Sequence, residues 1–272
     1  FETFAIIVSM LIFAVGWHAC SRNLPGNIIL LACAFLGVGL LDFAHMLSYA
    51  GMPDFVTPSG PEKAIDFWLA ERLLAGFALF VAVIMPWRPF ASGAIRYWLL
   101  AAVLATVTFI YWLILFHQDE LPNTFIPGQG LTPFKIATEY AVIALNLATA
   151  AVLLGAMRKP LRFDAAALFG AVCAMALSEF FFTVYASVTD VFNLMGHVYK
   201  VIAYLLLYRA IFVEAVETPY RQLSMSQNQL QATMDAIPDS LFELGLDGRY
   251  HDCHTSRPDL LAASVDNLLE KT

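Results

Sequence analysis

Seven long apolar segments separated by short polar stretches make up the first 214 residues of the chain. Each is close to the roughly 20 residues that an α-helix needs to cross the hydrocarbon core of a bilayer. Most are apolar on every side, whereas a helix of a water-soluble bundle has a polar face. The pattern predicts an all-α polytopic membrane protein, a bundle of seven transmembrane helices over residues 3–20, 28–51, 65–86, 97–117, 136–157, 165–188 and 194–214.

The pattern changes after this predicted bundle, residues 1–214. Residues 215–237 are mostly polar, with apolar residues every seventh position at Val216, Leu223, Leu230 and Ile237. This spacing is typical of a narrow seam between two helices. We expect a cytoplasmic signalling helix that pairs two copies of the chain; the alternative is a single amphipathic connector lying on the membrane or on a soluble domain.

Composition supports the membrane interpretation. The chain is 60% hydrophobic and 14% charged, with a mean hydropathy of +0.69, whereas soluble domains average about 25% charged residues. The basic residues do not form a stripe that could follow phosphates, so we expect no nucleic-acid partner. The four cysteines have no CxxC spacing and are interpreted as small apolar residues.

Basic residues gather in the odd-numbered loops and on the C-terminal side, at Arg22, Arg88, Arg96, Arg158, Lys159, Arg162, Arg209 and Arg221. The even-numbered loops hold only Lys63 and Lys135. Because cytoplasmic loops are enriched in Lys and Arg, the C-terminus is predicted to face the cytoplasm. The first residue then faces outward, and we expect a further helix before Phe1.

Ionisable residues inside the spans are the main functional signal. This topology puts most of them, together with the polar Trp68, in the outer half of the bilayer, where they would meet as a ligand-binding site: Asp42, His45, Trp68, Glu71, Arg72, Glu179, His197 and Lys200. Such groups are costly in a membrane unless they are paired, and they commonly mark a functional site. The alternative is a set of structural ion pairs that only fix helix packing.

His45 and His197 are the candidate metal ligands. They belong to different spans at similar predicted depth. Two imidazoles could ligate the iron of haem b axially, or could bind copper or zinc together with Asp42 or Glu179. The alternative is a pair of histidines held by hydrogen bonds in a packed network.

Two stretches carry resemblances to known families. The run AIPDSLFELGLDGRY, with an apolar strand from Leu241 to Leu246 and an Asp247-Gly248 turn, resembles the opening of a PAS domain, which implies that residues 238–272 are an incomplete PAS domain with an α/β fold. The motifs LLDFAHMLSYAGMPDF, FWLAERLLAG and LSEFFFTVYASVTDVFNLMGHVYKVIAYLLLYRAIF resemble the third class of bacterial membrane-associated sensor domains, the MASE group. The positions that match its polar motifs are Asp42, His45, Trp68, Arg72, Glu179, His197 and Lys200.

The second resemblance implies the sensory input module of a receptor in the bacterial inner membrane, a histidine kinase or a diguanylate cyclase acting through cyclic di-GMP. We expect a small-molecule or metal ligand in the outer-half site, with the last span transmitting the signal. A haem- or metal-dependent redox or gas sensor and a membrane transporter are the alternatives. The chain has no nucleophile and base pair, phosphate loop or HExxH motif that would predict catalysis.

Overall fold

The computed structural model describes residues 1–19, 24–126, 130–158, 164–184, 190–236, 241–245 and 250–254. The chain forms two compact units, Phe1–Glu217 and Thr218–Thr272. The predicted division at 214 and 237 into bundle, connector and PAS start stays a prediction. Among the residues used above, the following lie outside the described ranges: Arg22, Lys159, Arg162, Ile237, Leu246 and the Asp247-Gly248 turn.

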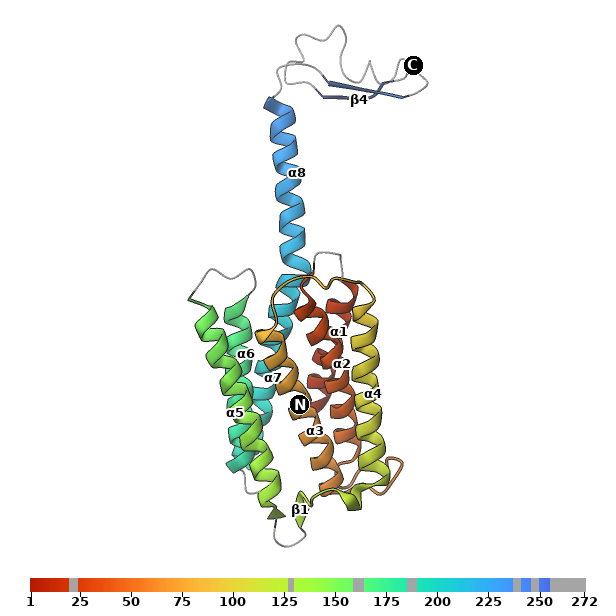
Figure 1. The fold of residues 1–272 in the computed structure, drawn as a ribbon, viewed down its shortest axis with the longest axis vertical. Helices are drawn as coiled ribbons and strands as arrows, with labels where there is room; N and C mark the ends of the chain where they lie inside the picture. The colour runs from red at the N-terminus through yellow and green to blue at the C-terminus, as the bar shows by residue number, and fades with distance from the viewer. Residues whose placement is uncertain are drawn as a thin grey trace. The chain divides into compact units, whose positions relative to one another are not determined.

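The first unit is a bundle of α-helices (Figure 1). Within the described residues its long helices are α1 (Glu2–His18), α2 (Gly26–Leu47), α3 (Pro61–Ile84), α4 (Ile95–Phe116), α5 (Pro133–Ala156), α6 (Ala165–Val184) and α7 (Val191–Phe212). Each overlaps one of the predicted apolar segments. Five of the described helices, α2 to α6, are long and apolar enough to span a membrane, and α1 is a shorter apolar helix. These helices are those of a polytopic helical membrane protein, while the count of seven spans stays a prediction.

Local sequence explains several helix ends. Pro61 and Pro133 occupy the first turns of α3 and α5, where a missing N–H costs nothing. Asp190 caps α7 by accepting a hydrogen bond from the backbone N–H of Phe192 at 3.1 Å. The predicted second segment ran to residue 51, but α2 ends at Leu47. The chain turns soon afterwards through Gly51, whose φ of +94° suits glycine.

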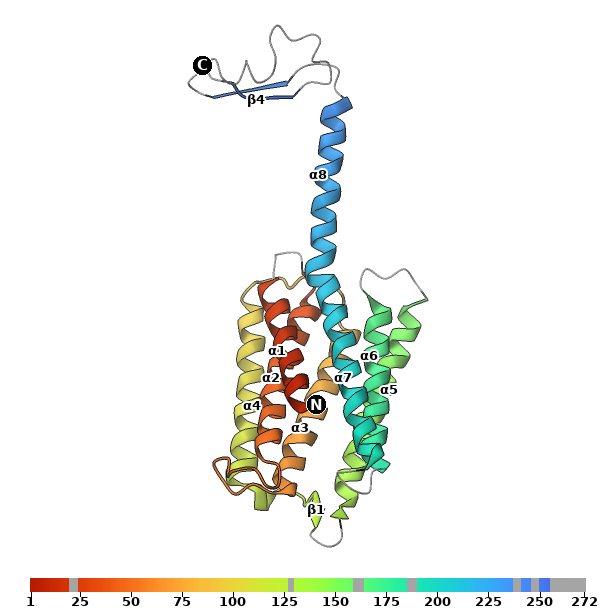
Figure 2. The same cartoon turned by 180° about the vertical axis from the view of Figure 1, so that it is seen from behind.

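Helices α3 and α7 join two groups of helices. In both views α1, α2 and α4 lie on one side and α5 and α6 on the other (Figures 1 and 2). Helix α3 packs on α2 and α5, and α7 packs on α6 and α1. The main apolar core contains side chains from α1, α2, α3, α5, α6 and α7, such as Phe35, Leu79, Leu153 and Leu207. Small residues allow the helices to approach closely: a Cβ built at Gly16 would lie 2.6 Å from the Cβ of Ala32.

Short elements close one end of this bundle. A single 3₁₀ turn, η1 (Gln118–Glu120), follows α4, and β1 (Phe125–Ile126) pairs antiparallel with β2 (Gly130–Leu131) before α5. The sequence did not predict this small hairpin, whose strands have two residues each. At the other end of α7, residues Val213–Glu217 form the π-helical turn η2.

The second unit begins with α8 (Thr218–Ala236), in which none of the residues is buried. It is followed by β3 (Leu241–Leu244) and β4 (Tyr250–His254), which pair antiparallel with an irregularity between Glu243 and Leu244. A hairpin was expected at this place. Its assignment to a PAS domain stays a prediction.

Candidate functional site

Arg72 is the centre of a buried ionic network. Its Nε atom lies 3.0 Å from Glu71 Oε2 and 3.2 Å from Glu179 Oε1. Glu71 and Arg72 come from α3 and Glu179 from α6, and all three side chains are at most 2% exposed. A buried charge that loses its partner is strongly destabilising, so this arrangement fixes α3 against α6.

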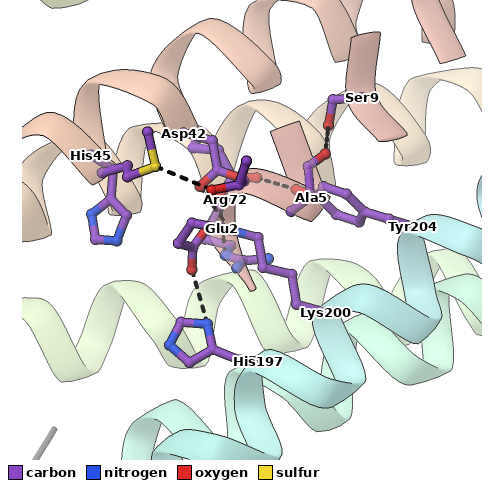
Figure 3. A network of polar contacts seen from close by, with 12 residues as sticks. Glu2, Ala5, Ser9, Asp42, His45, Arg72, His197, Lys200 and Tyr204 are labelled. Atoms are coloured by element: carbon purple, nitrogen blue, oxygen red, sulfur yellow. Dashed lines mark hydrogen bonds and ion pairs between the residues drawn. The ribbon is translucent and has the colours of Figure 1, made fainter. Parts of the chain in front are cut away.

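Lys200 of α7 makes the second set of contacts (Figure 3). Its Nζ atom donates to Asp42 Oδ1 of α2 at 2.7 Å and to Glu2 Oε2 of α1 at 2.5 Å. One turn along α7, the hydroxyl of Tyr204 donates to Glu71. Lys200 and Tyr204 therefore tie α7 to α1, α2 and α3 through charged or strongly polar contacts in the interior of the bundle.

Glu2 is a member of the network that the sequence did not predict. Its second carboxylate oxygen lies 2.9 Å from Nδ1 of His197. The predicted first span began at residue 3, so Glu2 was placed outside the membrane. The missed signal is its position at the start of a mostly apolar helix, α1, that packs on α2 and α7.

Lys135 and Glu139 of α5 form a further buried pair, with Nζ and Oε1 2.5 Å apart. Lys135 was predicted to be a loop residue facing outward. Instead it lies in the first turn of α5 with 1% exposure and also donates to the carbonyl oxygen of Phe182 at 3.2 Å. The prediction was wrong because Pro133 and the cap residue Thr132 start the helix earlier than the hydropathy pattern indicated.

A cavity of about 750 Å³ lies beside this network. Its lining includes three of the predicted site residues, His45, Trp68 and His197, together with Lys135 and Phe182. A smaller cavity of about 300 Å³ shares His45 and His197 and reaches Glu2. The volume of the larger one falls in the range of small-molecule sites, about 300–1,000 Å³.

An aromatic wall separates the large cavity from Arg72. Trp68 and Phe182 meet edge to face, with ring centroids 5.2 Å apart. The Arg72 guanidinium lies 5.4 Å from the Trp68 ring centroid and 5.8 Å from that of Phe182. On the cavity side Phe182 also meets the imidazole of His197, at 5.0 Å between centroids. A molecule in the cavity would thus contact the rings that cover the buried guanidinium.

The eight predicted site residues therefore form one connected region. His45, Trp68 and His197 line the cavity, and Asp42, Glu71, Arg72, Glu179 and Lys200 lie in the ionic network. This adjacency does not test their role in binding. His117 is outside the region, because its Nδ1 is bonded to Glu120 at the end of α4.

His45 and His197, the predicted metal ligands, share the cavity but are each held through Nδ1. Nδ1 of His45 lies 2.7 Å from the carbonyl oxygen of Ala64 in α3, and Nδ1 of His197 meets Glu2. Within the described ranges no group of three or more His, Cys, Asp or Glu side chains is arranged to hold a metal ion. Haem b, copper and zinc stay predictions.

Comparison with known proteins identifies the bundle. Residues 1–219 match a family model described as a membrane-associated sensor domain, MASE3. The chain belongs to the MASE3 family. Searches of curated proteins and of solved structures found no match.

The match gives the cavity and the network a setting. Both lie within the MASE3 domain, which also includes η2 at the end of α7. A membrane-associated sensor domain with an internal cavity can respond to a molecule only if the occupied and empty cavities favour different arrangements of its helices. In this domain α7 contributes His197 to the cavity and Lys200 to the network.

Proposed function

We propose that the chain is the sensory input module of a bacterial inner-membrane receptor, that a small molecule binds in the large cavity, and that α7 transmits the change. The observation that carries the proposal is the shared position of His197 and Lys200 on one helix. His197 lines the cavity, and three residues later Lys200 holds Asp42 and Glu2 in the buried network. In this topology all seven helices cross the bilayer, and the cavity faces its outer half.

The mechanism is a shift between two arrangements of α7. Glu2 contacts both His197 and Lys200, so a ligand that draws His197 toward the cavity weakens one of the two contacts of Glu2. The ammonium group of Lys200 then changes how closely it contacts Glu2 and Asp42. Because these charges are buried, small changes in their geometry carry large changes in energy and favour discrete positions over gradual ones.

The proposed receptor type is supported by the family and by α8. An output domain of the histidine kinase or diguanylate cyclase class would lie after residue 272, with a PAS domain between. The apolar residues Leu223 and Leu230 of α8 are 59% and 63% exposed in the single chain. Covering them in a parallel helix pair with a second copy would make a dimer the signalling unit.

Filling the cavity by mutation tests the proposal. The Ala64→Trp variant puts an indole into the cavity, and Thr183→Phe does so from α6; both residues line it. Ala151→Trp on the exposed face of α5 is the matched control. Hydrogen exchange in nanodiscs is measured over η2 and α8. We expect both filled variants to change exchange there by about threefold or more, with the control equal to the wild type.

If exchange changes around the cavity while η2 and α8 stay as in the wild type, the cavity is not coupled to the connector and the sensory role is rejected.

The second candidate, a haem- or metal-dependent sensor, is favoured by the two imidazoles at one cavity. A visible absorption spectrum and metal analysis of the purified protein decide it. The buried carboxylates keep transport as an alternative, for which ion flux in proteoliposomes is the test.

A further inference from the structure

The chemistry of the cavity restricts what can occupy it, provided that the cavity is the sensory site proposed above. Its wall is mostly apolar and aromatic, with the rings of Tyr49, Trp68, Phe125 and Phe182 and aliphatic side chains from α3, α5 and β2. Trp68, Phe182 and His197 already meet edge to face in this wall, and a further ring in the cavity would border the same aromatic side chains. Aromatic pairs of this kind add to the affinity gained from burial alone, so a planar ring is favoured as the body of the ligand.

The cavity also favours a neutral occupant. Among the lining residues that the structure describes, Lys135 is the only Lys, Arg, Asp or Glu. Its charge is already balanced by Glu139 at 2.5 Å. A charged ligand would therefore be buried without a counter-charge, which is costly in a water-poor site.

His45 determines which polar group the ligand must carry. The carbonyl oxygen of Ala64 can only accept, so the hydrogen in the 2.7 Å contact is on Nδ1 of His45. A neutral imidazole with a protonated Nδ1 has Nε2 as an acceptor. In the described part of the chain no hydrogen bond reaches this Nε2, and the ring borders the cavity. A ligand that satisfies it must donate a hydrogen bond.

His197 is compatible with the hydrogen-bond donor that His45 requires of the ligand. Its Nδ1 lies 2.9 Å from a carboxylate oxygen of Glu2. Its Nε2 accepts a hydrogen bond when the neutral ring is protonated on Nδ1 and donates one when Nε2 itself carries the hydrogen, as in the charged ring. A hydroxyl group both donates and accepts, so it suits His45 and either state of His197. A ketone oxygen only accepts and leaves His45 unsatisfied.

We propose that the cavity binds a neutral hydroxylated aromatic ring of the phenol or hydroquinone class and discriminates against the corresponding quinone. Such a molecule offers an apolar ring to Trp68 and Phe182 and a hydroxyl to His45. Membrane quinols and free phenolic compounds share this chemistry. If a quinol is the natural ligand, the domain reports the reduced fraction of the pool simply by binding one form and not the other.

Three compounds that share a tetramethylated ring test the proposal: duroquinol, 2,3,5,6-tetramethylphenol and duroquinone. Binding is measured anaerobically by calorimetry on the wild-type protein in nanodiscs, with empty nanodiscs subtracted for partition into lipid. One buried donor and acceptor pair corresponds to about a tenfold difference in Kd. We expect duroquinol to bind about tenfold more tightly than duroquinone. Tight binding of the phenol as well means that one hydroxyl suffices, and its absence means that a hydroquinone is needed; both results uphold the class.

The His45→Phe variant keeps a ring but removes Nε2, and it should bring the ratio of the duroquinone and duroquinol Kd values close to one. His117→Phe at the exposed end of α4 is the matched control and should keep the wild-type ratio. Equal binding of duroquinol and duroquinone to the wild type, or no binding of either hydroxylated ring, overturns the proposal even if His45→Phe does not fold. If the exchange response to cavity filling persists in that case, the sensory role stands and only the ligand class is wrong.

Discussion

Helices α4 and α7 have the same length of 22 residues but are held in the bundle in different ways. Helix α4 has no charged side chain after Arg96, buries only Val107 and Ile114, and leaves aromatic residues such as Trp98 and Phe109 exposed. Helix α7 buries Lys200 and Tyr204 against acidic groups of three other helices. Apolar contacts with lipid and neighbours allow gradual sliding, whereas paired buried charges favour discrete positions. This contrast is the basis for assigning the proposed switch to α7 and not to α4.

Removing the ammonium group of Lys200 should have the largest effect on stability and is the strongest test of the contrast between α4 and α7. Lys200→Met leaves Asp42 and Glu2 without their cation, which costs about 3–5 kcal/mol when a buried pair is broken. We expect a large fall in the unfolding temperature of the purified protein. The double variant Lys200→Met with Asp42→Asn should recover part of the loss, and an equal fall in both variants would show that the pair is not the cause.

Arg72→Met should have a similar or slightly smaller effect, since Arg72 balances Glu71 and Glu179 and also packs on Trp68. Breaking such a buried pair again costs about 3–5 kcal/mol. The same thermal measurement applies. Arg209→Met is the control, because the Arg209 side chain is 71% exposed and its ion pair with Asp164 is long, at 3.8 Å. A loss as large at Arg209 as at Arg72 would contradict the assignment.

Tyr204→Phe is the intermediate case. It removes the hydroxyl that donates to Glu71 and leaves a buried carboxylate oxygen with one partner fewer, a cost of about 1–3 kcal/mol. Tyr208→Phe, one turn later on the same helix and only half-buried, should be close to neutral. Chemical denaturation in detergent compares the two; equal effects would mean that the Tyr204 hydroxyl is not satisfied as described.

On α4 the expected effect is smallest. Phe109→Leu changes an exposed apolar side chain for another, and surface changes of this kind are usually within about 0.5 kcal/mol. The unfolding temperature should stay at the wild-type value. A fall comparable to that of Tyr204→Phe would show that α4 has a specific partner in the membrane and would weaken the contrast with α7.

The sequence was most informative where the free-energy cost of placing a residue in the membrane depends on the residue type itself. Apolar length located the seven helices, and the rarity of charge inside a span located Asp42, Glu71, Arg72, Glu179 and Lys200. What it missed lay at helix ends. Glu2 and Lys135 were assigned to the exterior because hydropathy falls at both positions, although tertiary packing buries Lys135 completely and Glu2 in large part.

Contacts through the backbone were also beyond prediction. The bond from His45 to the carbonyl of Ala64 depends on how α2 and α3 are placed, not on which residues surround His45 in the chain. The same applies to the bond from Ser178 to the carbonyl of Gly196 at 2.8 Å, which ties α6 to α7. Spacing along one helix indicates which side chains share a face but not which carbonyl lies opposite.

The central claim, that occupancy of the cavity moves α7 relative to the rest of the bundle, is tested most directly by a distance between the two helices compared above. Spin labels at Leu205→Cys of α7 and Leu104→Cys of α4, both exposed, are introduced with the four native cysteines replaced by alanine. Pulsed electron paramagnetic resonance in nanodiscs then compares the distance distribution between the two labels in the protein with the wild-type cavity and in the Ala64→Trp variant. We expect filling the cavity to transfer population to a second, distinct distance, with Ala151→Trp unchanged. Identical distance distributions in a folded Ala64→Trp protein would contradict the account.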